Sequence, residues 1–519
     1  MRPLRALAAL LLALACATPR PPPPAAPQAA PEPSASAPRA EPPPAAPLPA
    51  PDVDRSQPPP LGPNPPLTLP DQHHLSLRNG LRVRVVEDHR LPIVALDLVV
   101  DAGASRDPAP LPGLASFTAA MLSEGTRTRT ATEISDQVGY LGASLSAAAG
   151  PDAASLTGNC LSQHLPAFLE IFADVAQNPS FSSPDFERVL DERRVILLQQ
   201  RDQPSVVALK AFATTFWGKH PYGHPIIGTE AALSRMRPAD LVRFHDRLWR
   251  PANAELVVVG DVTEAGLRPL LERTLGPWKP GRRAPPLAQQ GPAAPHRTVL
   301  IEKPGASQAF LALGAPGLDR RSPDYVAATV MFEVLGGGSS SRLFRTLREE
   351  KGYTYGIGAG ADARRLGGGS VVRGSVKAEV TGAALKDLLF ELSRMRDEPV
   401  PEEELTEAKD GIVRSLPADF AMVSEIAGHL GELATDGLPD DYWNTYAQEV
   451  EQVTAADVQR MARKYLDLDR LTLVMVGPAQ VAPQLSSLPI GPLQVVHPTN
   501  PPLPRKPALT PAAARARAR

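Results

Sequence analysis

Cysteine and excess charge are both scarce in this sequence. It has two cysteines, Cys16 and Cys160, among 519 residues, and a formal net charge of −2. A near-neutral chain without a basic stripe gives no reason to expect nucleic acid as a partner. Cys160 lies in a mixed strand-like run, 154–161, and we interpret it as a small packed hydrophobic residue without a redox role.

Long apolar runs are also scarce, and the only one lies at the N-terminus. Two arginines precede the apolar segment 6–15, which is too short to span a bilayer and is typical of a secretory signal peptide, residues 1–15. Cleavage at the small-residue motif 13–15 would release a soluble periplasmic or secreted protein. Acylation of Cys16 would instead give a lipoprotein anchored in the membrane of a bacterial cell envelope. We favour the lipoprotein, although Ala13 stands where the lipobox usually has leucine.

Proline and alanine dominate both ends of the chain. Residues 16–70 contain no aromatic residue and few aliphatic ones other than alanine, so they cannot bury a core. We expect this segment to be an extended, disordered tether. Residues 484–519 are expected to be a disordered tail with a basic end.

The part between the two ends repeats itself. A helix-like segment, 240–248, leads to an apolar strand, 256–260, and the segment 457–465 leads in the same way to 473–477. The offset is 217 residues at both elements, since 457 − 240 and 477 − 260 are equal. Repeats of about 20–50 residues would indicate a solenoid, whereas this spacing indicates two tandem homologous domains.

We therefore predict two domains, residues 71–278 and 297–483, joined by a Pro/Gly/Ala-rich linker, residues 279–296. Strands and helices mix within each domain without strict alternation. This pattern favours an α+β fold, with helices packed on a sheet in each half, over a doubly wound parallel sheet.

The clearest single helix is predicted at residues 183–203. Its apolar seam contains Phe186, Leu190, Ile196 and Leu197. We expect this seam to face the core of the first domain.

A shorter buried helix is expected at residues 114–122, which follow an apolar strand and a polar turn. With its Gly-Leu-Ala entry at 113–115, this arrangement resembles the pitrilysin family of zinc peptidases, which includes insulin-degrading enzyme and the mitochondrial processing peptidase. The family carries His-x-x-Glu-His on this helix, where two imidazoles bind zinc and the glutamate activates its water. The corresponding positions here are Ser116, Ala119 and Ala120.

A second part of the family's metal site is replaced as well. The resemblance implies a third zinc ligand, a glutamate, seven residues after the start of a Glu-Arg pair. Here the pair at 192–193 leads to Gln199. Alanine offers a metal no donor, serine is a poor zinc ligand, and a neutral amide is far weaker than a carboxylate. We therefore expect no zinc or other cofactor on this chain, with zinc only in a partner subunit.

Further landmarks of the resemblance occur in the family's order over residues 71–480. His220 and His224 are separated by proline and glycine, which exclude a regular helix, so we expect no metal there. We expect Tyr222 to pack. The glycines that start at Gly336 lack the spacing of a phosphate-binding loop, and they predict a helix-ending turn where chains approach closely.

One functional element of the family is intact. Residues 347–355 resemble its arginine-and-tyrosine motif, with Tyr355 seven residues after Arg348. In active relatives this pair reaches across the cleft to the substrate, where both side chains can donate to a carbonyl oxygen that gains charge. The structural alternative is a surface arginine beside packed tyrosines.

Loss of one half-site and retention of the other suggests a division of labour. The resemblance implies two halves packed as a clam shell around a peptide cleft. Our first hypothesis is a non-catalytic subunit of a heteromeric zinc metallopeptidase at the bacterial cell envelope. Its partners would be a catalytic homologue with an intact His-x-x-Glu-His motif and an extended peptide, which Arg348 and Tyr355 would help to bind. The alternatives are a binding or scaffold protein with no proteolytic role, and an autonomous peptidase that uses other residues.

Overall fold

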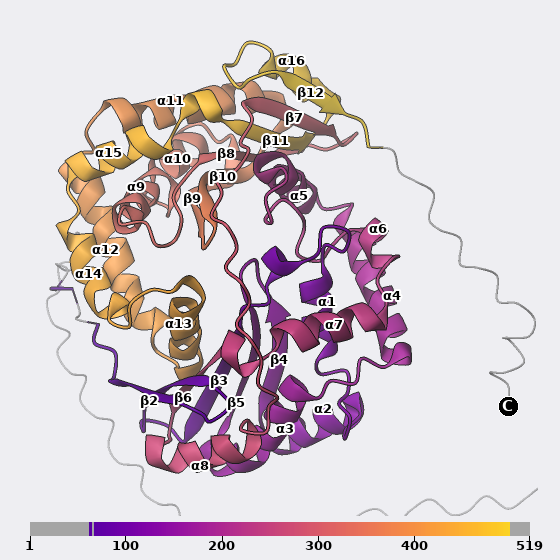
Figure 1. Cartoon of the computed structure of the whole chain (residues 1–519). Helices are drawn as coiled ribbons and strands as arrows, with labels where there is room; N and C mark the ends of the chain where they lie inside the picture. Colours follow the sequence, from indigo (N-terminus) through magenta and orange to yellow (C-terminus); the bar gives the residue numbers. More distant parts are fainter. Residues whose placement is uncertain (1–61, 65–66, 499–519) are drawn as a thin grey trace, which may run out of the picture. The chain divides into compact units, whose positions relative to one another are not determined.

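Two six-stranded sheets form the framework of the computed structural model, which describes residues 62–64 and 67–498 (Figure 1). The strands of the first sheet are β1 (Gln72–Ser76), β2 (Arg82–Glu87), β3 (Ile93–Val100), β4 (Ser144–Ala149), β5 (Ala154–Leu161) and β6 (Ala254–Gly260). Those of the second are β7 (Arg297–Glu302), β8 (Gln308–Pro316), β9 (Thr354–Arg364), β10 (Gly367–Lys377), β11 (Thr472–Gly477) and β12 (Leu493–Val496).

Helices pack around each sheet. The first half contributes α1 (Leu114–Met121), α2 (Ala131–Tyr140), α3 (Leu165–Gln177), α4 (Ser183–Gln200), α5 (Pro204–Trp217), α6 (Glu230–Leu233), α7 (Pro238–Leu248) and α8 (Glu264–Thr274). The second half contributes α9 (Tyr325–Gly336), α10 (Arg342–Phe344), the π-helical segment η4 (Arg345–Glu350), α11 (Thr381–Asp397), α12 (Glu402–Asp419), α13 (Val423–Asp436), α14 (Tyr442–Gln452), α15 (Ala455–Tyr465) and α16 (Ala482–Leu485).

Five strands of each sheet share one topology, which confirms the duplicated α+β fold. Their strand orders are β1-β2-β6-β3-β5-β4 and β12-β7-β11-β8-β10-β9. β2 pairs in parallel with β6, as β7 does with β11, and the three strands that follow in each sheet pair antiparallel. The outer strands differ, because β1 is antiparallel to β2 whereas β12 is parallel to β7. The repeat appears as α7 followed by β6 and as α15 followed by β11, and α7 and α15 begin 217 residues apart.

One helix of each half packs on the sheet of the other half. α5, from the first half, packs on β8 and β11, whereas α13, from the second half, packs on β3 and β6. Phe212 and Phe216 of α5 fill space that Gly314 and Gly369 leave on the second sheet, where a Cβ atom would lie 2.6 Å from each ring. This exchange ties the two halves into one unit.

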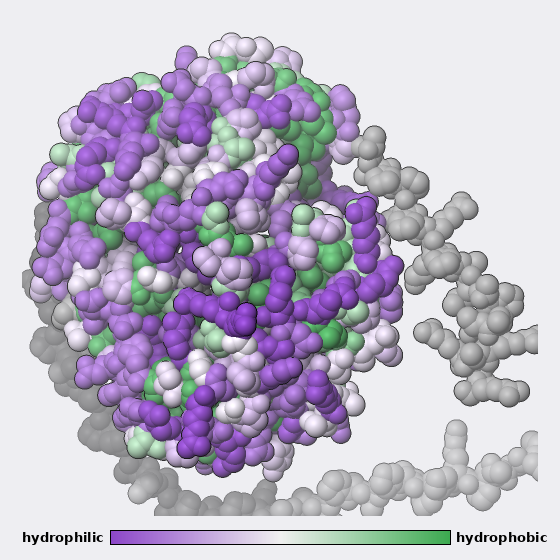
Figure 2. Space-filling model, in the orientation of Figure 1, coloured by the Kyte–Doolittle hydropathy of each residue, from purple (hydrophilic) through white to green (hydrophobic). Residues whose placement is uncertain are grey.

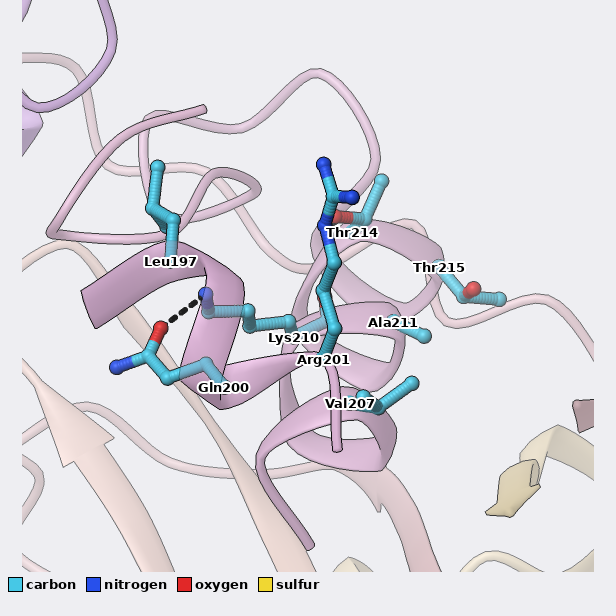
Figure 3. Close-up of a pocket in the computed structure, with 8 residues that line it drawn as sticks. All are labelled: Leu197, Gln200, Arg201, Val207, Lys210, Ala211, Thr214 and Thr215. Atoms are coloured by element: carbon cyan, nitrogen blue, oxygen red, sulfur yellow. Dashed lines mark hydrogen bonds between the residues drawn. The ribbon is translucent and has the colours of Figure 1, made fainter. Parts of the chain in front are cut away.

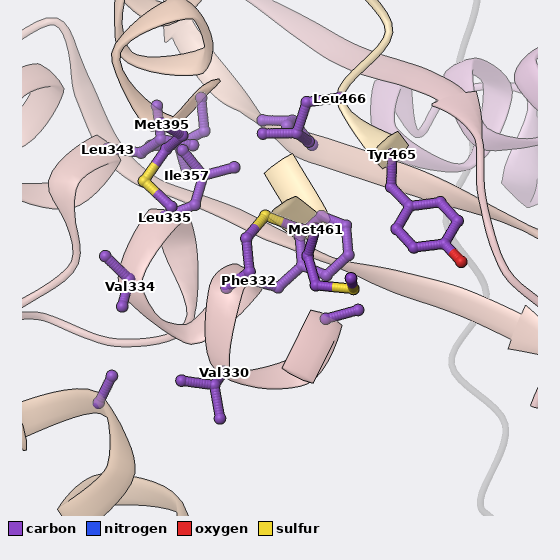
Figure 4. Close-up of a cluster of buried hydrophobic side chains, with 14 of the residues drawn as sticks. Val330, Phe332, Val334, Leu335, Leu343, Ile357, Met395, Met461, Tyr465 and Leu466 are labelled. Atoms are coloured by element: carbon purple, nitrogen blue, oxygen red, sulfur yellow. The ribbon is translucent and has the colours of Figure 1, made fainter. Parts of the chain in front are cut away.

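The core of the second half is a large apolar cluster beneath α9, α11 and α15 (Figure 4). Phe332, Leu335, Met395, Met461 and Ile357 are among its buried members. The cluster continues into the first sheet, because Ala95, Val257 and Val259 belong to it as well. The face of the first sheet under α13 therefore shares its core with the second half.

The structure corrects two predicted boundaries. The second domain does not end at residue 483, because α16 runs across this position and β12 then pairs in parallel with β7. The predicted tether also ends before residue 70, because Leu69 is buried and its N–H donates to Asn444 Oδ1 at 3.1 Å. In both places a few apolar residues inside a proline-rich stretch pack against the second half.

The described surface is polar where it meets water. Figure 2 shows hydrophilic residues over most of this face, with apolar residues in scattered patches. Within residues 62–64 and 67–498, no helix has both the length and the apolar character needed to cross a bilayer. The expected signal peptide and Cys16 lie outside the described residues.

Two glycines of α13 provide a matched test of the exchange. A Cβ at Gly431 would lie 2.6 Å from Asp97 Oδ2 and 3.1 Å from Val99 Cγ2, whereas one at Gly428 meets nothing within 4 Å. We expect Gly431→Ala to lower the free energy of unfolding by about 1–3 kcal/mol through overpacking. Gly428→Ala should raise it by up to about 1 kcal/mol, because alanine is the better helix former. Urea unfolding measures both, and equal effects would contradict the close contact of α13 with β3.

Candidate functional site

The short helix α1 begins as the sequence predicts, and a carboxylate fixes its entry. Gly113 adopts a left-handed conformation, with φ of 96°, directly before the helix. Asp107 accepts hydrogen bonds from the N–H groups of Gly113 and Ala115 at 2.6 and 2.7 Å. These bonds satisfy donors that the first turn of a helix leaves free.

The three motif positions lie on this helix but present no set of metal donors. Ala119 is buried, whereas Ser116 and Ala120 are half-buried. The Ser116 hydroxyl oxygen accepts a hydrogen bond from a guanidinium N–H of Arg193 at 2.5 Å. The one oxygen among these side chains is therefore already in use.

Arg193 is the charged group of this site that our sequence reasoning missed. It comes from α4, is only 7% exposed, and also donates to the carbonyl oxygen of Ile227 at 3.1 Å. Its guanidinium carbon lies 5.0 Å from the centre of the Phe117 ring, within cation–π range. Burial lowers the pKa of Arg193 to about 10, so the side chain stays protonated at neutral pH.

The charge of this guanidinium acts on the buried carboxylate of Asp107. Burial raises the pKa of Asp107 to about 7, while the two backbone N–H groups and the charge of Arg193 oppose the rise. The charge of Arg193 therefore opposes the effect of burial on Asp107 only in part. Arg193 itself is held by its hydrogen bonds to Ser116 and Ile227.

The residues at these positions do not fit a zinc ion. Zinc in proteins takes thiolate, imidazole or carboxylate ligands, and Ser116, Ala119 and Ala120 supply none of them. A cation beside Ser116 would also meet the positive charge of Arg193. Across the described part of the chain, no three His, Cys, Asp or Glu side chains cluster as a metal site would require.

Gln199 is not brought to Ser116. It is exposed on α4 and, six residues after Arg193, lies about 240° around the helix from it. Its neighbour Gln200 accepts from Lys210 Nζ at 2.5 Å and lines a cavity of about 400 Å³ between the end of α4 and α5 (Figure 3). Leu197 lines the same cavity.

The predicted apolar seam of α4 is correct at three of its four positions. Phe186 and Leu190 are buried and Leu197 packs on the core, but Ile196 is 41% exposed. Arg193 takes a buried place on this face instead. Its spacing of seven residues from Phe186 places both on one side of a helix, and this was the signal available in the sequence.

The loop that starts at His220 ties the two halves together. Tyr222 is buried, as predicted, and its hydroxyl donates to Asp152 at 2.5 Å and accepts from the N–H of Leu366 at 3.0 Å. Arg365, in the turn between β9 and β10, donates to Asp101 at 2.8 Å. The chain therefore uses this loop as a contact between halves.

Arg348 and Tyr355 are brought together. The guanidinium carbon of Arg348 lies 4.5 Å from the centre of the Tyr355 ring and 4.7 Å from that of Phe344. Tyr355 is 80% exposed, and in the described part of the chain the side chain of Arg348 makes only these ring contacts. Arg348 belongs to η4, and π-helical segments are frequent at functional sites. Both side chains can therefore donate hydrogen bonds to a ligand.

Two other predictions about individual residues can be compared with the structure. Cys160 is a buried free thiol, and burial raises its pKa to about 12, in keeping with a packing role. Gly336 ends α9, and a Cβ there would lie 2.5 Å from the backbone nitrogen of Ala359. The predicted close approach of two chain segments is thus confirmed.

A duplicated α+β unit with a degenerate metal motif on its first helix defines the class as peptidase-like. Residues 82–230 match the model for insulinase, peptidase family M16, and residues 235–412 match the model for the peptidase M16 inactive domain. The chain belongs to the M16 peptidase family, which confirms the resemblance to pitrilysin and its relatives.

Relatives and solved structures agree with this assignment. An uncharacterised zinc protease of Mycobacterium tuberculosis is 26% identical over 414 residues, covering 78% of this chain and 92% of that protein. A Pseudomonas fluorescens structure described as a peptidase M16 inactive domain has a TM-score of 0.75 and 27% identity, over 79% of this chain and 98% of that one. A Helicobacter pylori protease, with a TM-score of 0.74 and 21% identity over 79% of this chain and all of that one, supports the fold alone.

The buried guanidinium can be tested against its neighbour on the same helix. We expect Arg193→Met to lower the free energy of unfolding by about 1–3 kcal/mol, because it leaves the buried acceptors on Ser116 and Ile227 without their donor. Arg194 is exposed and pairs with Asp191 at 3.0 Å, so Arg194→Met should change stability by no more than about 0.5 kcal/mol. Chemical denaturation compares the two variants. Equal, small losses would show that Arg193 does not hold the degenerate site together.

Proposed function

We propose that this chain is the non-catalytic subunit of a heteromeric M16 peptidase. In this proposal it holds no zinc, and a homologous partner with an intact His-x-x-Glu-His motif supplies the metal and the attacking water. This chain contributes peptide binding and support for the transition state. The observation that carries the proposal is the contrast between the two half-sites: Arg193 fills the space beside Ser116, whereas Arg348 and Tyr355 lie together with their donors free.

The chemistry assigned to the pair is hydrogen bonding to developing charge. A guanidinium and a phenol can both donate to a carbonyl oxygen that becomes an oxyanion when the peptide bond is attacked. Stacking against Phe344 and Tyr355 fixes the plane of the Arg348 guanidinium, so less freedom is lost when a bond to the ligand forms.

The sheets supply places for an extended peptide. β4 and β9 are the outermost strands at one end of their sheets, so among residues 62–64 and 67–498 one side of each has no neighbouring strand. An extended peptide can pair with such an edge through its backbone, with affinity that depends little on any single side chain. Tyr355 lies on β9 itself, which places the proposed donor beside a free edge.

The relatives' names fit this role without defining it. The structure from Pseudomonas fluorescens is described as an inactive domain, and several relatives are named zinc proteases. A chain of this family without motif ligands is a suitable companion for one that has them. We place the complex at the bacterial cell envelope on the basis of the N-terminal sequence, with Cys16 as the lipid attachment site.

The first test uses the complex. With a co-expressed His-x-x-Glu-His homologue and an unstructured peptide, Arg348→Ala and Tyr355→Phe should each slow turnover by about 10²–10³, or about 2.7–4 kcal/mol, because one oxyanion donor is lost. Arg348→Lys should rescue only in part, since an ammonium lacks the planar fork. Lys351→Ala, an exposed neighbour, is the control and should leave turnover unchanged.

Complex formation, measured by size-exclusion chromatography, should survive in all four variants. Unchanged turnover in both Arg348→Ala and Tyr355→Phe would contradict the proposal and favour a scaffold without a proteolytic role.

The second test concerns anchoring. Cys16→Ala removes the attachment site, so it should shift the protein from the membrane fraction to the soluble fraction or block its maturation. Stable anchoring requires more than one acyl chain at that site. Mass spectrometry of the mature N-terminus provides the readout. A mature chain that begins at another residue, or an unmodified Cys16, would exclude the lipoprotein.

A further inference from the structure

The first sheet carries a polar face beside α13. Asp97 of β3 stands in register with Thr157 of β5, which stands in register with Ser146 of edge strand β4. Asn159 and Ser144 form the next row along on the same face. α13 packs on β3 and β6, and the side chains on β4 remain exposed. A row of hydroxyl and amide groups therefore leads from solvent to Asp97.

A cavity of about 120 Å³ lies where this face meets α13. Asp97, Ser144, Thr157, Asn159 and Ser424 are its polar lining residues. A water molecule needs only about 10–15 Å³ of such volume, so the cavity has room for several groups of that size. This is close to the size of a short unbranched chain with one polar end.

Asp97 is a buried acid without a charged partner. It is 7% exposed, and its Oδ1 has no hydrogen-bond partner among the described residues. Burial raises the pKa of Asp97 to about 7, and the Ser155 hydroxyl only partly opposes this. The residues that face it from the other packed elements, Thr157, Val257 and Gly431, carry no charge. A buried polar atom without a partner is costly, so Oδ1 suits a ligand that brings a donor.

We propose that this cavity binds a primary ammonium group, carried by a lysine side chain of an extended peptide. Only one carboxylate oxygen is free, since Oδ2 is turned toward Gly431. A guanidinium is best bound by two oxygens, whereas an ammonium is a compact donor that can bond one carboxylate oxygen and neighbouring hydroxyls. Ser144, Thr157 and Ser424 offer those hydroxyls. The inference rests on the proposed function only in taking a peptide as the ligand.

Binding to the isolated full-length chain tests the site without any partner. The probes are fluorescent, capped, alanine-rich peptides with one central lysine, norleucine or arginine, and the norleucine peptide with a free N-terminus. We expect the lysine peptide to bind at least tenfold more tightly than the capped norleucine peptide by fluorescence anisotropy. Its affinity should fall as the pH drops below about 7, because protonated Asp97 no longer attracts the ammonium.

Three variants identify the site. Asp97→Asn, of nearly the same shape, should remove the preference for lysine and leave norleucine binding unchanged. Gly428→Leu should do the same by filling the cavity, because Gly428 lines it and faces open space. Asp436→Asn is the control. Asp436 is a largely buried acid on α13 that lies outside this cavity, so this variant should keep the preference for the lysine peptide.

Thermal unfolding establishes that each variant is folded. Equal binding of the lysine and norleucine peptides, or an unchanged preference in both Asp97→Asn and Gly428→Leu, would overturn the proposal. Tighter binding of the free N-terminus or of arginine would overturn the assignment to lysine. Failure of the turnover test with Arg348 and Tyr355 would leave this measurement intact, because it needs no catalytic partner.

Discussion

The structure depends on the exchange of α5 and α13 between the two halves. Each helix covers the sheet of the other half, so neither sheet has a complete core without the neighbouring domain. Burial of apolar surface is the main favourable term in folding, and here much of it lies between the halves. We infer that the two halves unfold together. The same exchange sets where β4 and β9, the free edges, lie relative to the opposite half.

A buried guanidinium lies beside α1, the helix that carries the family's motif positions. Removal of zinc ligands from a helix packed against α4 would leave polar backbone and space behind. Here Arg193 lies beside Ser116 and donates to Ser116 and Ile227. A protein cation thus stands beside the helix on which the family carries a metal. Its hydrogen bonds join α1 to α4.

The duplication could be read from the sequence, but the exchange of α5 and α13 between the halves could not. The spacing of 217 residues located α7, β6, α15 and β11, because local periodicity and a terminal glycine mark a helix followed by a buried strand. The placement of α5 and α13 depends on contacts between distant residues, to which local patterns are blind. β12 was hidden because four strand residues lie among prolines, and its pairing depends on the open side of β7.

The candidate site positions were predictable to a similar extent. Arg348 and Tyr355 were found from their spacing, and the structure stacks them, because η4 and the first residues of β9 are joined by a short turn. Gln199 was placed by motif spacing alone, and helical phase turns it away from α1. Arg193 escaped notice because a charged residue in an apolar seam is usually assigned to the surface. Its partners, Ser116 and the carbonyl oxygen of Ile227, come from other parts of the chain.

Acidic side chains lie at the contact between the two halves. They make the stability of this contact respond to pH in two opposing ways. Burial alone would raise the pKa of Asp101, but hydrogen bonds from Arg106 and Arg365 outweigh burial and lower it. Its contribution is therefore present above its ordinary pKa and is lost as pH falls. Asp97 and Asp436 behave in the opposite sense, because burial raises their pKa values to about 7 and about 6, so their contributions are lost as pH rises from about 4 through those values. Near neutral pH the Asp101–Arg365 tie is fully formed while Asp97 is only partly ionised. A cation that enters beside Asp97 would stabilise the charged form of this acid. It would thereby strengthen the contact between the two halves at a pH where ionisation of Asp97 weakens that contact.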